Sequence, residues 1–214
     1  MEISWYGHSC FRISERGKVA VVTDPFDSKV VGFSPIKLRA EIVTISCDSP
    51  GHNYIKAVKS KPRLINGPGE YEVGGVFITG VQTNGHKKKA DEQRNTLYVI
   101  NYGNITVAHL GELTRVLGQS EVEALGTVNI ALVPVGDGSS LNAAKAAEVI
   151  SLIEPNIVIP MHYGTSESRM NLDPLSKFLK EMGLTQLETM DMFKAANAKA
   201  LPEETKVVVL NIRS

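Results

Sequence analysis

Apolar residues in the first half of the chain come in short runs that alternate with polar positions and are separated by turn-forming residues. This period of two is typical of strands with one buried face. Glycine-containing pairs, Gly74–Gly75 and Gly103–Asn104, lie where two hairpins should reverse direction. The pattern predicts strands over residues 3–6, 10–13, 19–23 and 42–46, and hairpins over 71–83 and 95–110. The first half is therefore predicted to be mainly β-sheet.

The second half of the chain changes to a helical period. Asn142 can cap a helix over residues 143–153, whose apolar positions recur at helical spacing. A second amphipathic segment, residues 172–182, ends at a glycine. Short apolar strands are predicted over 157–160 and 207–212. Strands first, then helices alternating with strands, indicate an α/β (α+β) fold with layered sheets and helices outside.

The composition is that of an ordinary folded chain. With 214 residues, 43% of them hydrophobic and 21% charged, it can bury a sizeable core and is too apolar for wholesale disorder. We expect a single domain over residues 1–214. Lys and Arg number 23, and so do Asp and Glu, so the net charge is zero. We therefore expect neither nucleic acid nor a membrane surface as a partner, while a homo-oligomer stays open.

Three features bear on the cellular compartment. No uninterrupted apolar run approaches the roughly 20 residues that span a bilayer. The N-terminal residues follow the pattern of a strand and have neither the basic head nor the apolar core of a signal peptide. The two cysteines, Cys10 and Cys47, cannot form a disulfide framework. We expect a cytoplasmic protein.

Candidate chemistry gathers just after the predicted strands, where loops carry functional groups on a rigid scaffold. Each of these residues alone has an ordinary structural explanation, such as a turn or a hydrogen-bonded histidine. Together they favour a site, because metal and catalytic centres collect groups from several elements. The candidates are His8, Asp24, the segment from Cys47 to His52 with Asp48, His86, Glu112 and His162.

Several longer sequence motifs are distributed along nearly the whole chain. They are WYGHSCFRI, VVTDPF, AEIVTISCDSPGHN, NGPGEYEVGGVFITGV, NTLYVI, HLGEL, LVPVG and VIPMHYGT. In these motifs the chain resembles the metallo-β-lactamase superfamily, and within it the small metal-dependent hydrolases related to L-ascorbate-6-phosphate lactonases. The resemblance implies a four-layer αββα sandwich with the active site along one edge of the two sheets.

The same resemblance implies a degenerate metal motif. The HxHxDH motif of the family is CDSPGH here, so Cys47, Ser49 and Gly51 stand at its first His, second His and Asp, and only His52 is kept. The later loop histidine falls at Gly85 or, with a shift of one residue, at His86. A glutamate, Glu112, replaces the bridging aspartate, and His162 matches the final metal histidine.

These replacements matter because two divalent ions repel each other and need several imidazoles and a bridging carboxylate. A glycine offers no ligand and a serine hydroxyl is a poor one for zinc. We therefore expect a protein without the dinuclear zinc centre and hydrolytic activity of its relatives. The alternative is a mononuclear hydrolase with His52, Glu112 and His162 as ligands and Cys47 as a further candidate ligand. The cofactor is then either absent or one zinc or manganese ion.

The remaining cleft residues have other roles under the same resemblance. His8 would lie beside the cleft as a hydrogen-bond donor or a substrate contact, and Asp24 would hold a neighbouring histidine in orientation. A third interpretation is a metal-independent protein that binds a small molecule around Cys47 and His8. The sequence identifies no substrate or ligand. His86, at the end of the first long hairpin, and Asp48 complete the candidate cleft.

Overall fold

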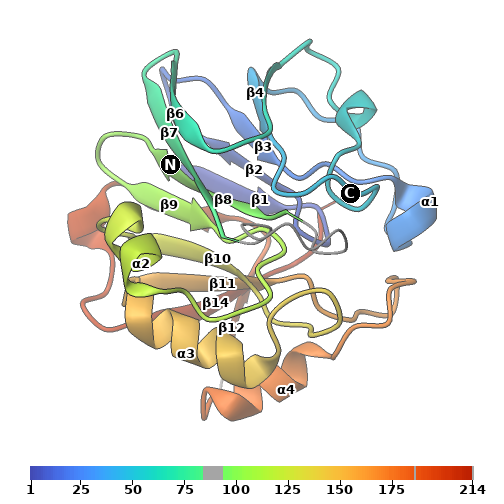
Figure 1. Ribbon diagram of the computed structural model, residues 1–214, viewed down its shortest axis with the longest axis vertical. Coiled ribbons are helices and arrows are strands. Elements are labelled where there is room, and N and C mark those ends of the chain that lie inside the picture. Colours follow the sequence, from blue (N-terminus) through green and yellow to red (C-terminus); the bar gives the residue numbers. More distant parts are fainter. Residues whose placement is uncertain (84–93, 186, 214) are drawn as a thin grey trace.

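The computed structural model describes residues 1–83, 94–185 and 187–213. Their strands form two sheets (Figure 1). The first sheet has the order β13-β1-β2-β3-β4-β5. Its strands are β1 (Glu2–Trp5), β2 (Phe11–Ser14), β3 (Val21–Thr23), β4 (Ile42–Thr44), β5 (Arg63–Ile65) and β13 (Phe193–Lys194).

The second sheet is larger and has the order β12-β14-β11-β10-β9-β8-β7-β6. Its strands are β6 (Gly69–Val73), β7 (Val76–Gln82), β8 (Thr96–Asn101), β9 (Thr106–His109), β10 (Ile130–Pro134), β11 (Ile157–Met161), β12 (Glu188–Met190) and β14 (Lys206–Leu210). The hairpins β6–β7 and β8–β9 are antiparallel, whereas β9, β10, β11 and β14 run parallel. Both predicted hairpins are therefore present.

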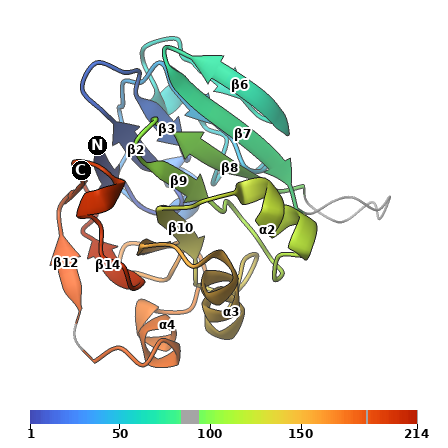
Figure 2. The same cartoon turned by 90° about the vertical axis from the view of Figure 1, so that its left-hand side faces the viewer.

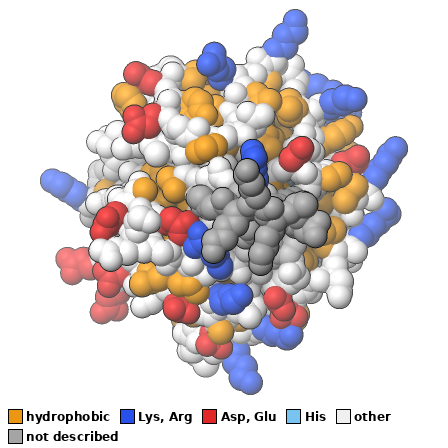
Figure 3. Space-filling model, in the orientation of Figure 1, with side chains coloured by type: hydrophobic (Ala, Val, Ile, Leu, Met, Phe, Trp, Pro, Cys, Tyr) orange, Lys and Arg blue, Asp and Glu red, His pale blue; other side chains and the backbone are white. Residues whose placement is uncertain are grey.

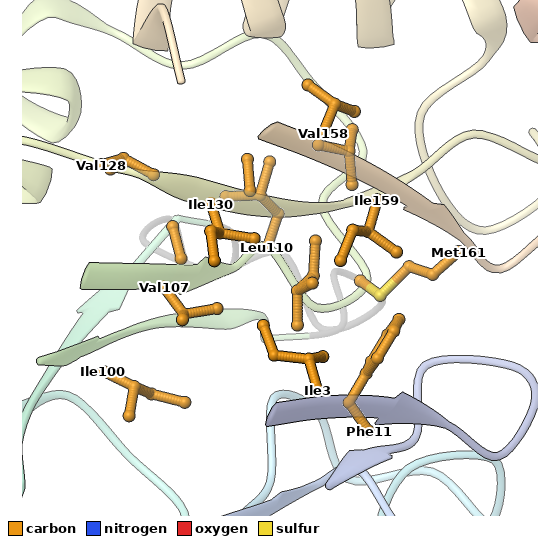
Figure 4. Close-up of a cluster of buried hydrophobic side chains, with 14 of the residues drawn as sticks. Ile3, Phe11, Ile100, Val107, Leu110, Val128, Ile130, Val158, Ile159 and Met161 are labelled. Carbon is orange, nitrogen blue, oxygen red and sulfur yellow. The ribbon is translucent and has the colours of Figure 1, made fainter. Parts of the chain in front are cut away.

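The main core lies between the two sheets. Ile3 and Phe11 of the first sheet face Val107 and Ile159 of the second (Figure 4). Successive strand residues point to opposite faces, so Val21 joins this core while its neighbour Val22 joins a second cluster on the other face. The period of two seen in the sequence is thus the physical cause of the layering.

Four α-helices lie in the described residues: α1 (Ser28–Val31), α2 (Gln119–Leu125), α3 (Ala143–Ile153) and α4 (Leu175–Glu181). Two short 3₁₀ helices span Ile55–Ala57 and Ala198–Ala200. Helices α3 and α4 pack on each other outside the second sheet (Figures 1 and 2), and Val31 of α1 packs with Val22 and Val43 outside the first. The predicted α/β (α+β) class, with two sheets packed between helices, is confirmed.

Some predicted boundaries were wrong, for local reasons. The helix predicted over 172–182 begins only at Leu175, because Pro174 is its N-cap and disfavours helical backbone at the residue before it. The α3 prediction was correct, with the Asn142 side chain accepting from the Lys145 amide. Strand β10 was missed because all of it is buried, so it shows no alternation.

The surface is mixed in character. No helix of the described residues is long and apolar enough to cross a membrane. Basic and acidic side chains are interspersed on the face shown in Figure 3.

Candidate metal centre

The candidate residues lie on loops that leave one edge of the two sheets. His8 is in the turn between β1 and β2, and Asp24 directly follows β3. His52 lies in the loop after β4, Glu112 after β9 and His162 after β11. Strands β3 and β4 are parallel, as are β9, β10 and β11, so their carboxyl ends bring these loops together.

Two imidazoles meet one carboxylate at the centre of the site. Nε2 of His52 and Nε2 of His162 each lie 3.8 Å from Oε1 of Glu112. Both histidines are buried and Glu112 is only 8% exposed. Among the described residues, neither Nε2 atom has a hydrogen-bond partner.

Asp24 fixes the His52 ring from behind. Its Oδ2 atom lies 2.8 Å from Nδ1 of His52 and accepts the hydroxyl of Ser46, while Oδ1 accepts the Ser46 amide at 2.7 Å. An ionised carboxylate only accepts, so Nδ1 of His52 carries a proton and Nε2 faces Glu112. Asp24 itself has a left-handed backbone, with φ 38°.

His162 is oriented in the same way by a serine. The Ser140 hydroxyl lies 3.2 Å from the Asp137 carbonyl, to which it donates, and 3.2 Å from Nδ1 of His162. Because a hydroxyl has a single proton, its oxygen accepts from Nδ1 of His162. The lone pair of His162 is therefore on Nε2, and this nitrogen and Nε2 of His52 face the same Glu112 oxygen.

Glu112 is held in place by three groups. Its Oε2 accepts the Cys47 thiol at 3.1 Å, and its Oε1 accepts the Ser139 hydroxyl. The Asn95 side-chain oxygen accepts the backbone amide of Glu112 at 2.8 Å. These contacts fix the position of the Glu112 carboxylate.

His8 completes the cluster. Its ring centroid lies 4.2 Å from that of His162 and 4.8 Å from that of His52. One ring nitrogen from each of these three histidines lies within 4.8 Å of the other two. A second group of the same kind joins Cys47, His52 and Glu112.

Burial and neighbouring charges set the protonation states. Burial, followed by repulsion from His52, lowers the pKa of His162 to about 3. Burial also lowers the pKa of His8, with His162 and His52 adding to the effect. Burial opposes the charge of His52, yet the Asp24 carboxylate outweighs it and raises the pKa of His52 well above its ordinary value. Burial raises the pKa of the Cys47 thiol, which keeps it a donor to Glu112.

A pocket of about 450 Å³ opens beside this cluster. Cys47 lies in its wall, so the pocket reaches the residue that contacts Glu112. Its polar lining includes Asp48, Asn53, Asn66 and Arg94. Asp48 is exposed at this pocket, where its carboxylate accepts from the Asn53 amide, and it is not part of either potential ligand group.

Comparison with known proteins identifies the family. The sequence model of the β-lactamase superfamily domain matches residues 2–162. The chain belongs to the metallo-β-lactamase superfamily.

Relatives of the chain include UPF0173 proteins, some of which are described as metal-dependent hydrolases. A UPF0173 protein of Pyrococcus furiosus is 28% identical over 205 residues, covering 85% of this chain and 90% of the relative. A UPF0173 metal-dependent hydrolase of Methanosarcina mazei is 28% identical, covering 77% and 84%. A Thermotoga maritima crystal structure, assigned to a Zn-dependent hydrolase of this superfamily, has a TM-score of 0.80 and 35% identity, covering 98% of this chain and 97% of that one.

Most sequence-derived candidates of this metallo-β-lactamase-fold chain lie together. The structure brings Cys47, His52 and His162 against Glu112. His8 lies against the two histidines, and Asp24 contacts His52. Asp48 stays at the pocket surface. His86 and Gly85, the two candidate positions for the loop histidine, lie outside the described residues.

Sequence reasoning missed several supporting residues. Ser139 and Ser140 follow β10 in the segment VGDGSS, and a position after a strand was the available signal. Asn95, at the start of β8, shows no such signal. His109 is buried beside the site, 4.0 Å from Asp24, with Nε2 against the Ser9 carbonyl. Ser139, Ser140 and Asn95 contact Glu112 or His162, whereas His109 contacts the Ser9 carbonyl.

Proposed function

We propose that this chain is a metal-dependent hydrolase with one divalent ion, held by His52, His162 and Glu112. The convergence of two Nε2 atoms on one carboxylate oxygen, each at 3.8 Å, carries the proposal. Ligand atoms around a tetrahedral zinc ion at about 2.0–2.1 Å lie roughly 3.3–3.4 Å apart, so small side-chain movements suffice. Two histidines and a glutamate are the protein ligands of some single-zinc hydrolases.

Unpaired nitrogens support a ligand role for these histidines. Buried polar atoms almost always have a hydrogen-bond partner. In the described part of the chain, Nε2 of His52 and Nε2 of His162 have none, while the Nδ1 atom of each ring is engaged. This is the arrangement of metal-ligating histidines, whose second nitrogen donates to a carboxylate, carbonyl or water.

The motif supports one ion over two. Cys47 Sγ lies 3.8 Å from the Ser49 hydroxyl, so both side chains occupy the same side of the loop. A single thiol with a raised pKa, engaged with Glu112, is a weak basis for a second centre. Gly51 contributes no side chain.

A bound ion would act as a Lewis acid and lower the pKa of a coordinated water. The chain's own residues prepare the site for it. Asp24 and Ser140 fix the two imidazole rings, and Glu112 is fixed by Cys47, Ser139 and Asn95. Burial of the ligands strengthens their electrostatic interactions, while the pocket beside Cys47 provides room for a small polar substrate.

The test is metal content together with hydrolysis. Protein purified without chelator is loaded with zinc or manganese, and the bound metal is counted by mass spectrometry. We expect one ion per chain and metal-dependent hydrolysis of phosphodiester or lactone substrates. His162→Ala should lose both, whereas His109→Gln, a change at a buried histidine outside the ligand set, should retain the ion.

Three results would overturn the proposal. Two ions per chain would mean that a dinuclear centre survives. No ion would favour the loss of hydrolytic function expected from the motif, or a metal-independent ligand site around Cys47 and His8. One ion without hydrolysis of either substrate class would refute the catalytic part.

A further inference from the structure

His8 is buried at the centre of the site. The proposed function, in which His52, His162 and Glu112 are the ligands, assigns it no role. His8 is 1% exposed, and neither of its ring nitrogens has a hydrogen-bond partner among residues 1–83, 94–185 and 187–213. A histidine with only a structural role would engage at least one nitrogen. The ring instead lies against the rings of His52 and His162.

The backbone holds His8 in this position against its own preference. Its φ of 50° is in the left-handed region, where a residue with a side chain is uncommon. The His8 carbonyl accepts the Trp5 indole N–H at 3.0 Å and the His162 amide at 3.1 Å. Such conformations persist where the surrounding structure fixes them, and they concentrate at functional sites.

Gly51 explains how the imidazole fits. A Cβ atom at Gly51 would lie 3.0 Å from Nε2 of His8, which is tighter than ordinary contacts allow. Gly51 is not among the glycines with positive φ, so its backbone does not require glycine. The absence of a side chain at this position is therefore matched to the presence of the His8 ring.

We propose that His8 is a metal ligand that takes the place of the motif aspartate, for which Gly51 is substituted. The inference rests on the proposed function, since it adds a ligand to the ion held by His52, His162 and Glu112. One ring nitrogen of each histidine lies within 4.8 Å of the others, which is compatible with a common ion.

Exchanging a carboxylate for an imidazole changes the metal preference. Imidazole ligands suit zinc, copper, iron and nickel, whereas carboxylates suit magnesium, calcium and manganese. A site with three imidazoles should therefore prefer zinc to manganese. Restoring the aspartate and removing His8 should shift the preference towards manganese.

The experiment exchanges the two positions in the full chain. The variants are His8→Gly, which keeps the left-handed backbone without strain, Gly51→Asp, and the double variant. Zinc and manganese affinities are measured by competition with a chromophoric chelator, and cobalt absorption spectra report the ligand set independently of activity. Circular dichroism confirms that each variant is folded, and His109→Gln serves as the histidine control.

We expect His8→Gly to lower zinc affinity by more than about 100-fold, since the loss of an outer-shell partner alone costs about 10–100-fold. Gly51→Asp should also weaken zinc binding, because its side chain meets the His8 ring. The double variant should recover zinc affinity to within about 10-fold of the natural protein, with a smaller zinc-to-manganese ratio.

The outcomes separate this inference from the proposed function. A natural protein that binds no metal would overturn the proposed function and the inference with it. One ion with an unchanged affinity and cobalt spectrum in His8→Gly would overturn only the inference. A folded double variant that fails to recover affinity would refute the exchange of His8 for the motif aspartate.

Discussion

The carboxylate of Asp24 is fully buried. It stabilises the fold and fixes the orientation of the His52 ring. Asp24→Asn keeps the shape of the side chain but replaces an ionised acceptor by an amide. The amide N–H would donate to Nδ1 of His52, which moves the ring proton to Nε2. The nitrogen that faces Glu112 would then lose its lone pair and could not ligate a metal.

The expected magnitude follows from three contacts. Asp24 accepts the Ser46 amide at 2.7 Å, the Ser46 hydroxyl at 2.5 Å and faces Nδ1 of His52 at 2.8 Å. Hydrogen bonds to charged groups contribute roughly 1.5–3 kcal/mol each, and breaking a buried ion pair costs about 3–5 kcal/mol. The asparagine retains one acceptor, so we expect the free energy of unfolding to fall by about 3 kcal/mol.

Urea unfolding of the metal-free protein measures the stability loss, and chelator competition measures the zinc affinity. We expect the affinity to fall about 10- to 100-fold. The matched control is Asp48→Asn, at an exposed carboxylate whose partner is Asn53, and it should change stability by less than about 0.5 kcal/mol. If Asp24→Asn behaves like this control in both assays, the reasoning from ring orientation is wrong.

Three further predictions concern the scaffold. Tyr98→Phe should lower the free energy of unfolding by about 1 kcal/mol, because the buried hydroxyl donates to the Ile45 carbonyl at 2.8 Å; an unchanged urea midpoint would contradict this. Ile130→Ala, in the core between the sheets, should cost about 2–5 kcal/mol, whereas Phe77→Ala, at a side chain that is 53% exposed, should cost far less; equal losses would contradict the assigned core. Chelation should lower the melting temperature by less than about 10 °C, since a core of this size folds without metal; unfolding on chelation would show that the metal is structural.

The elements with a clear period were the ones that the sequence predicted well. The β6–β7 and β8–β9 hairpins and α3 carry alternating or helical apolar patterns, glycine turns and an Asn142 cap. Strand β10 has no such period because both its faces are buried. The short β5 and β13 depend on pairing with β4 and β1, a tertiary interaction that local pattern does not encode.

The residues of the candidate site also fall into two groups: those that the sequence predicted and those that only the structure identified. The sequence predicted five polar residues as functional because each lies just after a predicted strand: His8, Asp24, His52, Glu112 and His162. Sequence did not predict that Ser139 and Ser140 would fix Glu112 and His162, because their partners are 27 and 22 residues away. Such pairings depend on how parallel strands set their loops side by side.

The sequence by itself determined which residue types are available: His52, Glu112 and His162 as potential ligands, with Cys47, Ser49 and Gly51 in the segment before His52. Only the tertiary structure decided what the remaining residues do. Folding brings the turn that carries His8 against Gly51 and His162. The physical reason is that ligand geometry depends on distances between loops from different strands, and these are set by sheet packing and not by spacing along the chain.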